Sequence, residues 1–144
     1  MVSAEETLPL VIALHRLLRG LRRASGDGAT PPTQLIVLGL LTQHGPMRIG
    51  ELAVRIPCSQ PTATAVVATM RQNGLVSRAP DPNDGRGVYV APTEEGLRTL
   101  RSVARGEAEV LAELLATVPP EDRTAVLDAA PVFLALADRT APSP

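Results

Sequence analysis

A turn of only three residues, Ile56-Pro57-Cys58, separates two segments whose apolar residues recur at helical spacing. The spacing predicts a short helix from about Ile49 to Arg55 and a longer helix from about Ser59 to Asn73. Ser59 can cap the longer helix, because its hydroxyl can accept a hydrogen bond from a free amide of the first turn. Two helices joined by so short a turn form a helix-turn-helix, in which the second helix enters the major groove of DNA.

Two short strands are expected after this pair of helices, at residues 75–79 and 87–91. The second strand alternates, with Val88 and Val90 on one face and Tyr89 on the other. The loop between the strands is long and polar, with an arginine at its tip. A hairpin in this position makes the helix-turn-helix a winged one.

Helical spacing also marks the chain on both sides of this core. Helices are expected from Leu8 to Arg23, over residues 34–43, and from a cap at Thr93 to about residue 117. A last helix covers about residues 121–138, and the proline inside it, at position 131, should bend or break it. These terminal helices are too apolar for a lone domain of this size to hide, which suggests a second subunit. The fold class is therefore mainly α with a small β-hairpin, an α+β domain.

Composition excludes several classes of partner. Aromatic residues make up 1% of the chain, so modules that stack unpaired bases on aromatic side chains are poor candidates. No apolar run approaches the roughly 20 residues of a membrane span, and the N-terminus lacks a secretory pattern. We therefore expect a cytoplasmic protein with no membrane partner.

No catalytic or metal-binding set is found in the sequence. All fourteen basic residues are arginine, which excludes a lysine nucleophile. Cys58 is the single cysteine and lies far in sequence from His15 and His44, so neither a disulfide nor a metal site of known spacing is expected. We expect neither an enzyme nor a cofactor.

Charge is distributed unevenly, although the net charge is −1. Residues 34–92 carry five arginines against three acids, whereas residues 93–144 carry five arginines against nine acids. The basic middle of the chain coincides with the winged helix-turn-helix, as phosphate binding requires.

Four segments of this core carry a family pattern: Gly50-Glu51-Leu52-Ala53, Ser59-Gln60-Pro61-Thr62-Ala63-Thr64, Asn73-Gly74-Leu75-Val76-Ser77-Arg78 and Asp81-Pro82-Asn83-Asp84-Gly85-Arg86. With them the chain resembles the MarR (multiple-antibiotic-resistance regulator) family of dimeric bacterial transcription factors over nearly its whole length. It departs from the family at Pro92-Thr93, where Leu-Thr is usual, and at Ala65, where a basic residue is common.

The resemblance implies one MarR-like domain over residues 1–144, with its winged DNA-binding part at 34–92. Dimerisation helices would occupy residues 5–24 and 93–138, and residues 139–144 would form a tail. It also implies a homodimer, with interleaved first, fifth and sixth helices, that binds a near-palindromic double-stranded operator. A repressor released by a small phenolic or aromatic effector between the dimerisation and DNA-binding parts is implied as well, with its binding residues unknown.

The first turn of the predicted recognition helix is polar, whereas Val66, Val67 and Met70 should pack inward. Its short side chains can reach base edges or phosphates, or can serve only as caps and solvated groups. Arginines before the first helix, late in the second helix and at the start of the wing can contact phosphate or be solvated. The full set of expected DNA-binding residues is Ser59, Gln60, Thr62, Ala63, Thr64, Arg71, Arg78, Arg86 and Arg48.

Arg86 on the wing is the strongest of these candidates, because an arginine on a polar loop can enter the narrow minor groove. Asp84 can orient its guanidinium through a bidentate pair, so Asp84 and Gly85 are expected to support the wing.

Two other functions remain open. A winged helix can bind protein partners through the same surface, although the polar recognition helix lacks the apolar cluster that such an interface favours. Cys58, next to a helix N-terminus, can be a reactive thiol of a redox-responsive regulator or a small buried residue.

Overall fold

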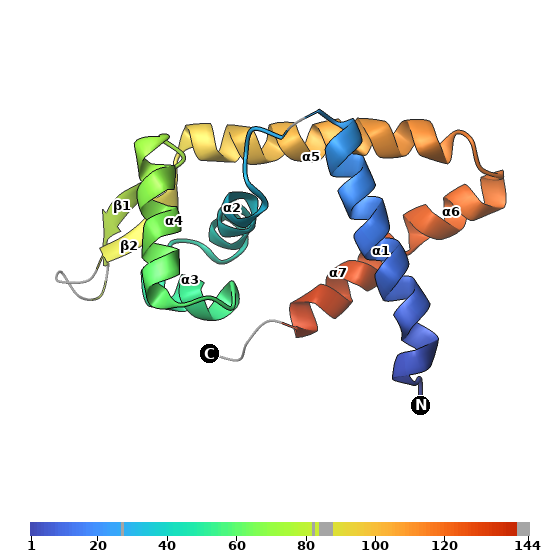
Figure 1. The fold of residues 1–144 in the computed structure, drawn as a ribbon, viewed down its shortest axis with the longest axis horizontal. Coiled ribbons are helices and arrows are strands. Elements are labelled where there is room, and N and C mark those ends of the chain that lie inside the picture. The colour runs from blue at the N-terminus through green and yellow to red at the C-terminus, as the bar shows by residue number, and fades with distance from the viewer. Residues whose placement is uncertain (27, 82, 84–87, 141–144) are drawn as a thin grey trace.

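The computed structural model describes residues 1–26, 28–81, 83 and 88–140 (Figure 1). A group of short helices and a two-stranded sheet lies at one end of the long helix α5 (Glu94–Leu115), and α1 (Ala4–Ala24) crosses that helix nearer its other end. The chain therefore has a winged part and a part built from its terminal helices, joined by α5. No helix in the described ranges is long and apolar enough to cross a membrane.

The winged part contains α2 (Pro32–His44), α3 (Ile49–Arg55), α4 (Gln60–Gln72) and the strands β1 (Val76–Pro80) and β2 (Val88–Pro92). The helix-turn-helix and its wing are thus confirmed, with α3 at the predicted bounds and each strand one residue later than predicted. The strands pair antiparallel, from Val76 opposite Pro92 to Pro80 opposite Val88. The core between them is made of buried side chains of α2, α3, α4 and the strands, among them Val37, Leu38, Leu41, Leu52, Val67, Met70 and Val90.

Met47, two residues before α3, joins the sheet directly. The backbone of Met47 donates to the Val90 carbonyl at 3.1 Å and accepts from the Val90 amide at 2.7 Å. The start of the helix-turn-helix is therefore hydrogen-bonded to the wing.

A close junction attaches α5 to the winged part. Thr93 caps α5 by accepting from the Gly96 amide at 3.0 Å, and its hydroxyl donates to the Gly74 carbonyl at 2.5 Å. The Thr93 amide also donates to the Leu75 carbonyl at 3.1 Å. At Gly96 an added Cβ would lie 2.1 Å from that same carbonyl oxygen, so only glycine fits there.

The terminal helices differ from prediction in their bounds. Helix α1 begins four residues before the predicted Leu8, because Ser3 and Glu6 form a capping box in which each accepts from the backbone amide of the other. The last predicted helix is divided into α6 (Pro120–Asp128) and α7 (Ala130–Arg139). Pro131 lies in the first turn of α7, where its missing N–H costs no helical hydrogen bond, so the expected break is confirmed.

Apolar side chains are exposed along these terminal helices. In the single chain α6 and α7 bury no residue completely, and α1 buries only Leu21. The exposed large apolar residues here are Leu8, Leu10, Val11, Ile12, Leu17, Leu18, Leu114, Val126, Leu127, Val132, Phe133, Leu134 and Leu136. A monomer would leave this whole face in water.

Candidate nucleic-acid interface

Helix α4 presents its first turn to solvent. Ser59 is the N-cap, and its Oγ accepts from the Thr62 amide at 3.2 Å and lies 2.8 Å from the Thr62 hydroxyl. Gln60, Thr62 and Thr64 are all exposed. The predicted cap is therefore present, and it holds a short row of polar side chains at the end of the helix that a helix-turn-helix directs toward DNA.

The opposite face of α4 is buried. Val67 and Met70 lie in the core and Val66 packs against it, as predicted. Ala63 is a correction: it was expected to contact DNA, but it is 1% exposed. It lies four and seven residues before Val67 and Met70, and this spacing places it on their face of the helix. Its methyl group anchors the recognition helix and does not reach a base.

The hydrogen bonds of this turn distinguish its polar groups. The Thr64 hydroxyl donates to the Gln60 carbonyl at 2.9 Å, and the Thr62 hydroxyl is shared with Ser59. The side-chain amide of Gln60, in contrast, forms no hydrogen bond with any residue that the structure describes. Gln60 thus presents both an amide donor and a carbonyl acceptor to an approaching base pair.

A polar groove of about 500 Å³ runs between the second half of α4 and β1. Arg71 and Arg78 line it together with Gln72 and Ser77. The fold thus brings Arg71 of α4 and Arg78 of β1 to one groove. Two exposed guanidinium groups in one groove suit a backbone phosphate, because each can form a charge-assisted hydrogen bond to its oxygens.

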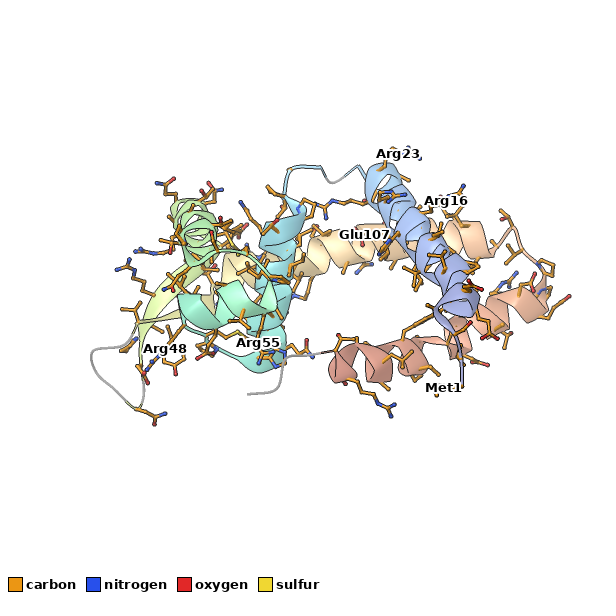
Figure 2. The ribbon with its side chains drawn as sticks, turned by 60° about the horizontal axis from the view of Figure 1, so that its bottom comes forward. Met1, Arg16, Arg23, Arg48, Arg55 and Glu107 are labelled. Atoms are coloured by element: carbon orange, nitrogen blue, oxygen red, sulfur yellow. The ribbon has the colours of Figure 1, made fainter. Side chains whose placement is uncertain are left out.

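Arg48, which Figure 2 labels before α3, has a partner that the sequence did not indicate. Its guanidinium forms a hydrogen-bonded ion pair with Asp81, at the end of β1, and lies 5.6 Å from the ring centroid of Tyr89. The Asp81 side chain is only 1% exposed, whereas that of Arg48 is 49% exposed. The hydrogen bond and the charge of Asp81 raise the pKa of Arg48 above its ordinary value. A phosphate contact by Arg48 stays a prediction, and its observed contacts join the wing to α3.

Arg86, Asp84 and Gly85 lie outside the described residues. Cys58 is half-buried in the turn before α4, and its amide donates to the Ala53 carbonyl at 3.0 Å. Among the described residues, no three of His, Cys, Asp and Glu are grouped so that they could hold a metal ion.

The exposed face of α4, a helix described in full, carries no large apolar side chain. Its exposed residues are small or polar, namely Gln60, Pro61, Thr62, Thr64, Ala65, Ala68, Thr69, Arg71 and Gln72. A protein partner would require an apolar centre on this face, so its composition favours a nucleic acid.

Comparison with known proteins places the chain among transcription regulators. The sequence profile of the MarR family matches residues 31–88. The uncharacterised HTH-type transcriptional regulator Mb0904 of Mycobacterium bovis is 37% identical over 131 residues, which cover 91% of this chain and 92% of that protein.

Solved structures share the fold. RV1404 from Mycobacterium tuberculosis superposes with a TM-score of 0.76 at 22% identity, over 94% of each chain. A MarR family protein from Bacillus stearothermophilus superposes with a TM-score of 0.72 at 24% identity, over 96% of this chain and 100% of the other. The winged helix and its flanking helices are thus an arrangement found in other proteins.

Proposed function

This chain belongs to the MarR family of helix-turn-helix transcriptional regulators, and on that premise we propose that it is a homodimeric repressor of a near-palindromic double-stranded operator. The observation that carries the proposal is the first turn of α4, where polar groups are exposed over a buried face. Gln60 reads a base in the major groove, because a glutamine amide matches the donor and acceptor pair that adenine presents there. Ser59, Thr62 and Thr64 contact neighbouring base edges or phosphates.

The phosphate contacts surround this turn. Arg71 and Arg78 hold one phosphate in the groove between α4 and β1, and Arg86 enters the minor groove from the wing. Arg48 positions the wing through its ion pair with Asp81, and about half of its side chain remains accessible to the phosphate backbone of DNA. Asp84 and Gly85 support the wing tip.

A dimer is supported by the surface area of the chain. The single chain exposes 9977 Å², whereas a compact monomer of 15.1 kDa would expose about 7,100 Å². The excess is about 2,900 Å² per chain, or about 5,800 Å² for two chains, which is at the upper end of the 2,000–5,000 Å² or more that obligate interfaces bury in total. Most of the exposed large apolar side chains are on α1, α6 and α7. These helices form the subunit interface.

Repression and its release by a small molecule are supported by two similar proteins. A Bacillus subtilis protein that is 28% identical over 67% of this chain is named the transcriptional repressor MdtR. The structure of Bordetella bronchiseptica BpsR, with a TM-score of 0.61 and 19% identity, is described in terms of regulation of DNA binding by 6-hydroxynicotinic acid. A small phenolic or aromatic effector releases this protein from its operator.

Fluorescence anisotropy tests the proposal. The full chain is titrated against labelled duplex DNA from beside its own gene, with scrambled duplex as competitor, at two salt concentrations. We expect binding that resists the competitor and weakens steeply with salt, because each neutralised phosphate releases counterions. Equal competition by scrambled DNA would refute sequence-specific binding. No binding at low salt by a confirmed dimer would favour a protein partner, and a pull-down would then identify it.

A further inference from the structure

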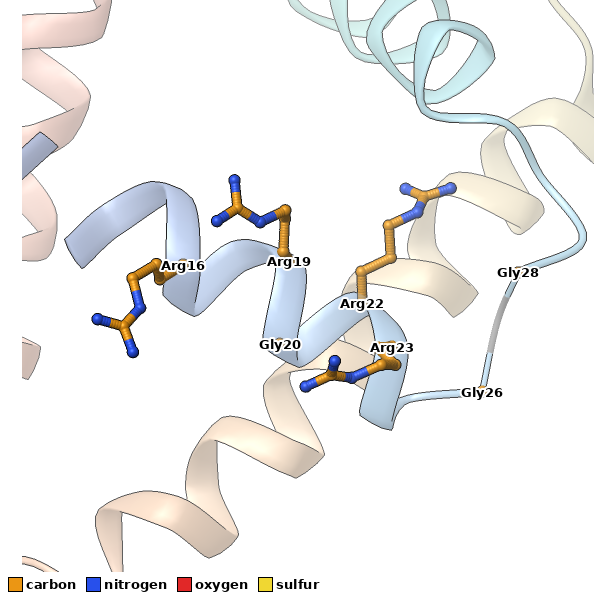
Figure 3. A pocket seen from close by; sticks show the side chains of 7 residues that line it. All are labelled: Arg16, Arg19, Gly20, Arg22, Arg23, Gly26 and Gly28. Carbon is orange, nitrogen blue, oxygen red and sulfur yellow. The ribbon is translucent and has the colours of Figure 1, made fainter. Parts of the chain in front are cut away.

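A stripe of five exposed side chains runs along α1 and changes character halfway. Its members recur every three or four residues and are Leu8, Ile12, Arg16, Arg19 and Arg23. The first two are apolar and the last three are cationic, and Figure 3 shows the arginine side chains projecting from the second half of the helix. At 3.6 residues per turn, the stripe lies opposite Leu21, the one residue of α1 that the chain itself buries. It therefore faces away from α5, on which α1 packs.

The charge of this stripe is not balanced within the chain. The second half of α1 carries four arginines and no acid. Arg22 lies off the stripe and donates to the Thr30 carbonyl. Among the residues that the structure describes, none pairs with the guanidinium groups of Arg16, Arg19 and Arg23. Like charges three and four residues apart repel one another along a helix, so an anionic surface on this face would stabilise it.

A second stripe, with the complementary pattern, runs along α6 and α7. Its members are all exposed and are Glu121, Ala125, Asp128, Val132 and Leu136. Backbone hydrogen bonds keep it continuous where the two helices meet. The Ala129 amide donates to the Ala125 carbonyl at 3.2 Å, and the Phe133 amide donates to the Ala129 carbonyl at 3.0 Å. In this stripe the acidic residues come first and the apolar residues second.

The acidic half of the second stripe also lacks a partner in the chain. In the described ranges no group donates to the carboxylates of Glu121 and Asp128. Arg123, the one basic residue of α6, donates through Nε to the carbonyl of Leu115 at 3.1 Å. Residues 107–128 carry six acids against this single arginine. The chain thus exposes two unpaired helix faces of opposite charge.

The two stripes match when the helices are antiparallel. Seven residues separate Arg16 from Arg23, and seven separate Glu121 from Asp128. One register therefore places Arg23 beside Glu121, Arg16 beside Asp128, Ile12 beside Val132 and Leu8 beside Leu136. A parallel arrangement would instead set the arginines against the apolar half of the second stripe. Charge and hydrophobicity thus select the same orientation.

We propose that the arginine half of α1 pairs with the acidic half of α6 of a second copy of this chain, antiparallel and in this register. The chain does not cover the stripes itself, because their four apolar members remain between 48% and 58% exposed. Two-fold symmetry forms the contact twice, since α1 of each copy meets α6 of the other.

This pairing rests on the proposed homodimer and adds what its apolar faces leave open. Hydrophobic contact is not directional, whereas opposite charges at fixed positions set the register of the helices. A chain with other charges at these positions would place like charges opposite one another. The pairing therefore selects a second copy of this chain over similar chains that lack the pattern.

Charge reversal on each stripe tests the pairing. Arg16→Glu/Arg23→Glu reverses the basic stripe, and Glu121→Arg/Asp128→Arg reverses the acidic one. Each variant alone sets like charges against one another in both contacts, so we expect its dimer dissociation constant to rise about tenfold or more. An equimolar mixture of the two variants should form the heterodimer in preference to either homodimer, because both of its contacts pair opposite charges. Sedimentation equilibrium gives the constants, and native mass spectrometry of differently tagged chains identifies the dimers.

Two further variants serve as controls. Arg71→Glu/Arg78→Glu makes the same change of charge on the winged part and should leave the dissociation constant unchanged. The chain with all four reversals should dimerise with itself as the wild type does, and should not form mixed dimers with the wild type. Circular dichroism confirms that each variant folds. At about 1 M salt, where charges are screened within about 3 Å, the two stripe variants should approach the wild type.

Two results would overturn the pairing. The first is random mixing of the two stripe variants. The second is a loss of dimerisation that neither the mixture nor the chain with all four reversals restores, which would mean that the charges face other groups. A monomeric wild type would refute the homodimer and the pairing together, whereas a dimeric wild type with random mixing would refute the pairing alone.

Discussion

The guanidinium of Arg48 pairs with the buried carboxylate of Asp81 across 33 positions of the sequence, and so joins the residue before α3 to the end of the first wing strand. The wing is thus positioned by a charged contact as well as by the backbone pairing of Met47 with Val90. Both contacts tie the wing to the start of α3 within a single chain.

Arg48→Ala should lower the free energy of unfolding, because it removes the guanidinium that pairs with the buried Asp81 carboxylate. The matched control is Arg105→Ala, which breaks the ion pair of Arg105 with Glu109. The two side chains are 84% and 67% exposed, so this change should lower the free energy of unfolding by at most about 0.5 kcal/mol. Urea denaturation measures both, and equal losses would contradict a structural role for the Arg48 pair.

Gln60→Ala should weaken operator binding by about 1–3 kcal/mol and relax the preference at one base pair per half-site. Thr69→Ala is the control on the same helix, since that exposed hydroxyl already donates to the Ala65 carbonyl at 3.2 Å and lies beyond the first turn. Anisotropy against operators substituted at each position measures the effect. An unchanged preference at every position would refute base reading by Gln60.

Arg71→Gln should weaken binding to all sequences alike and should reduce the slope of log affinity against log salt by about one. The groove that Arg71 shares with Arg78 predicts a similar effect of Arg78→Gln. Arg98→Gln, on α5, should leave the slope unchanged. A change in sequence preference in place of a change in slope would mean that Arg71 contacts a base.

Leu134→Glu should produce a monomer, because Leu134 is 68% exposed on α7 in the single chain and a buried carboxylate would disfavour the interface. Val54→Glu is matched in exposure, at 67%, but lies on α3 and should remain dimeric. Light scattering coupled to size exclusion gives the mass of each. A monomeric wild type at micromolar concentration would refute the dimer itself.

Gly96→Ala should destabilise the protein by about 3 kcal/mol or more, because the new Cβ would overlap the Leu75 carbonyl and force α5 away from the winged part. Gly106→Ala on the same helix meets only the Ser25 Cβ at 3.5 Å, an ordinary contact, and should stabilise by about 0.5–1 kcal/mol. Thermal melts of the two variants should shift in opposite directions. A melt of Gly96→Ala like that of the wild type would contradict the close junction.

Much of the fold could be predicted because the points where helices begin and end are determined by residues close to them in the sequence. The tight turn at Pro57, the cap at Ser59 and the break at Pro131 each depend on neighbouring residues, and the structure has all three. The start of α1 was missed although Ser3 and Glu6 carry the spacing of a capping box.

The site was harder to predict because it depends on which residues meet in space. The burial of Ala63 could have been predicted from its spacing to Val67 and Met70. It was nevertheless assigned to the interface, because its neighbours in the sequence were expected to contact DNA. The pairing of Arg48 with Asp81 carries no sequence signal, since it exists only once the hairpin has folded back beside α3. The groove shared by Arg71 and Arg78 has the same origin.

The tight junction at Gly96 has a consequence for how the molecule moves. Since α5 and the winged part are in backbone contact there, any reorientation of α5 carries the recognition helix with it. Helix α5 has 22 residues and is about 33 Å long at 1.5 Å per residue. A tilt of about 6° at its far end therefore displaces the winged part by about 3.4 Å, the rise of one base along a DNA strand. In the proposed dimer, tilting of the two α5 helices would move the winged parts in and out of register with the operator while neither core rearranges.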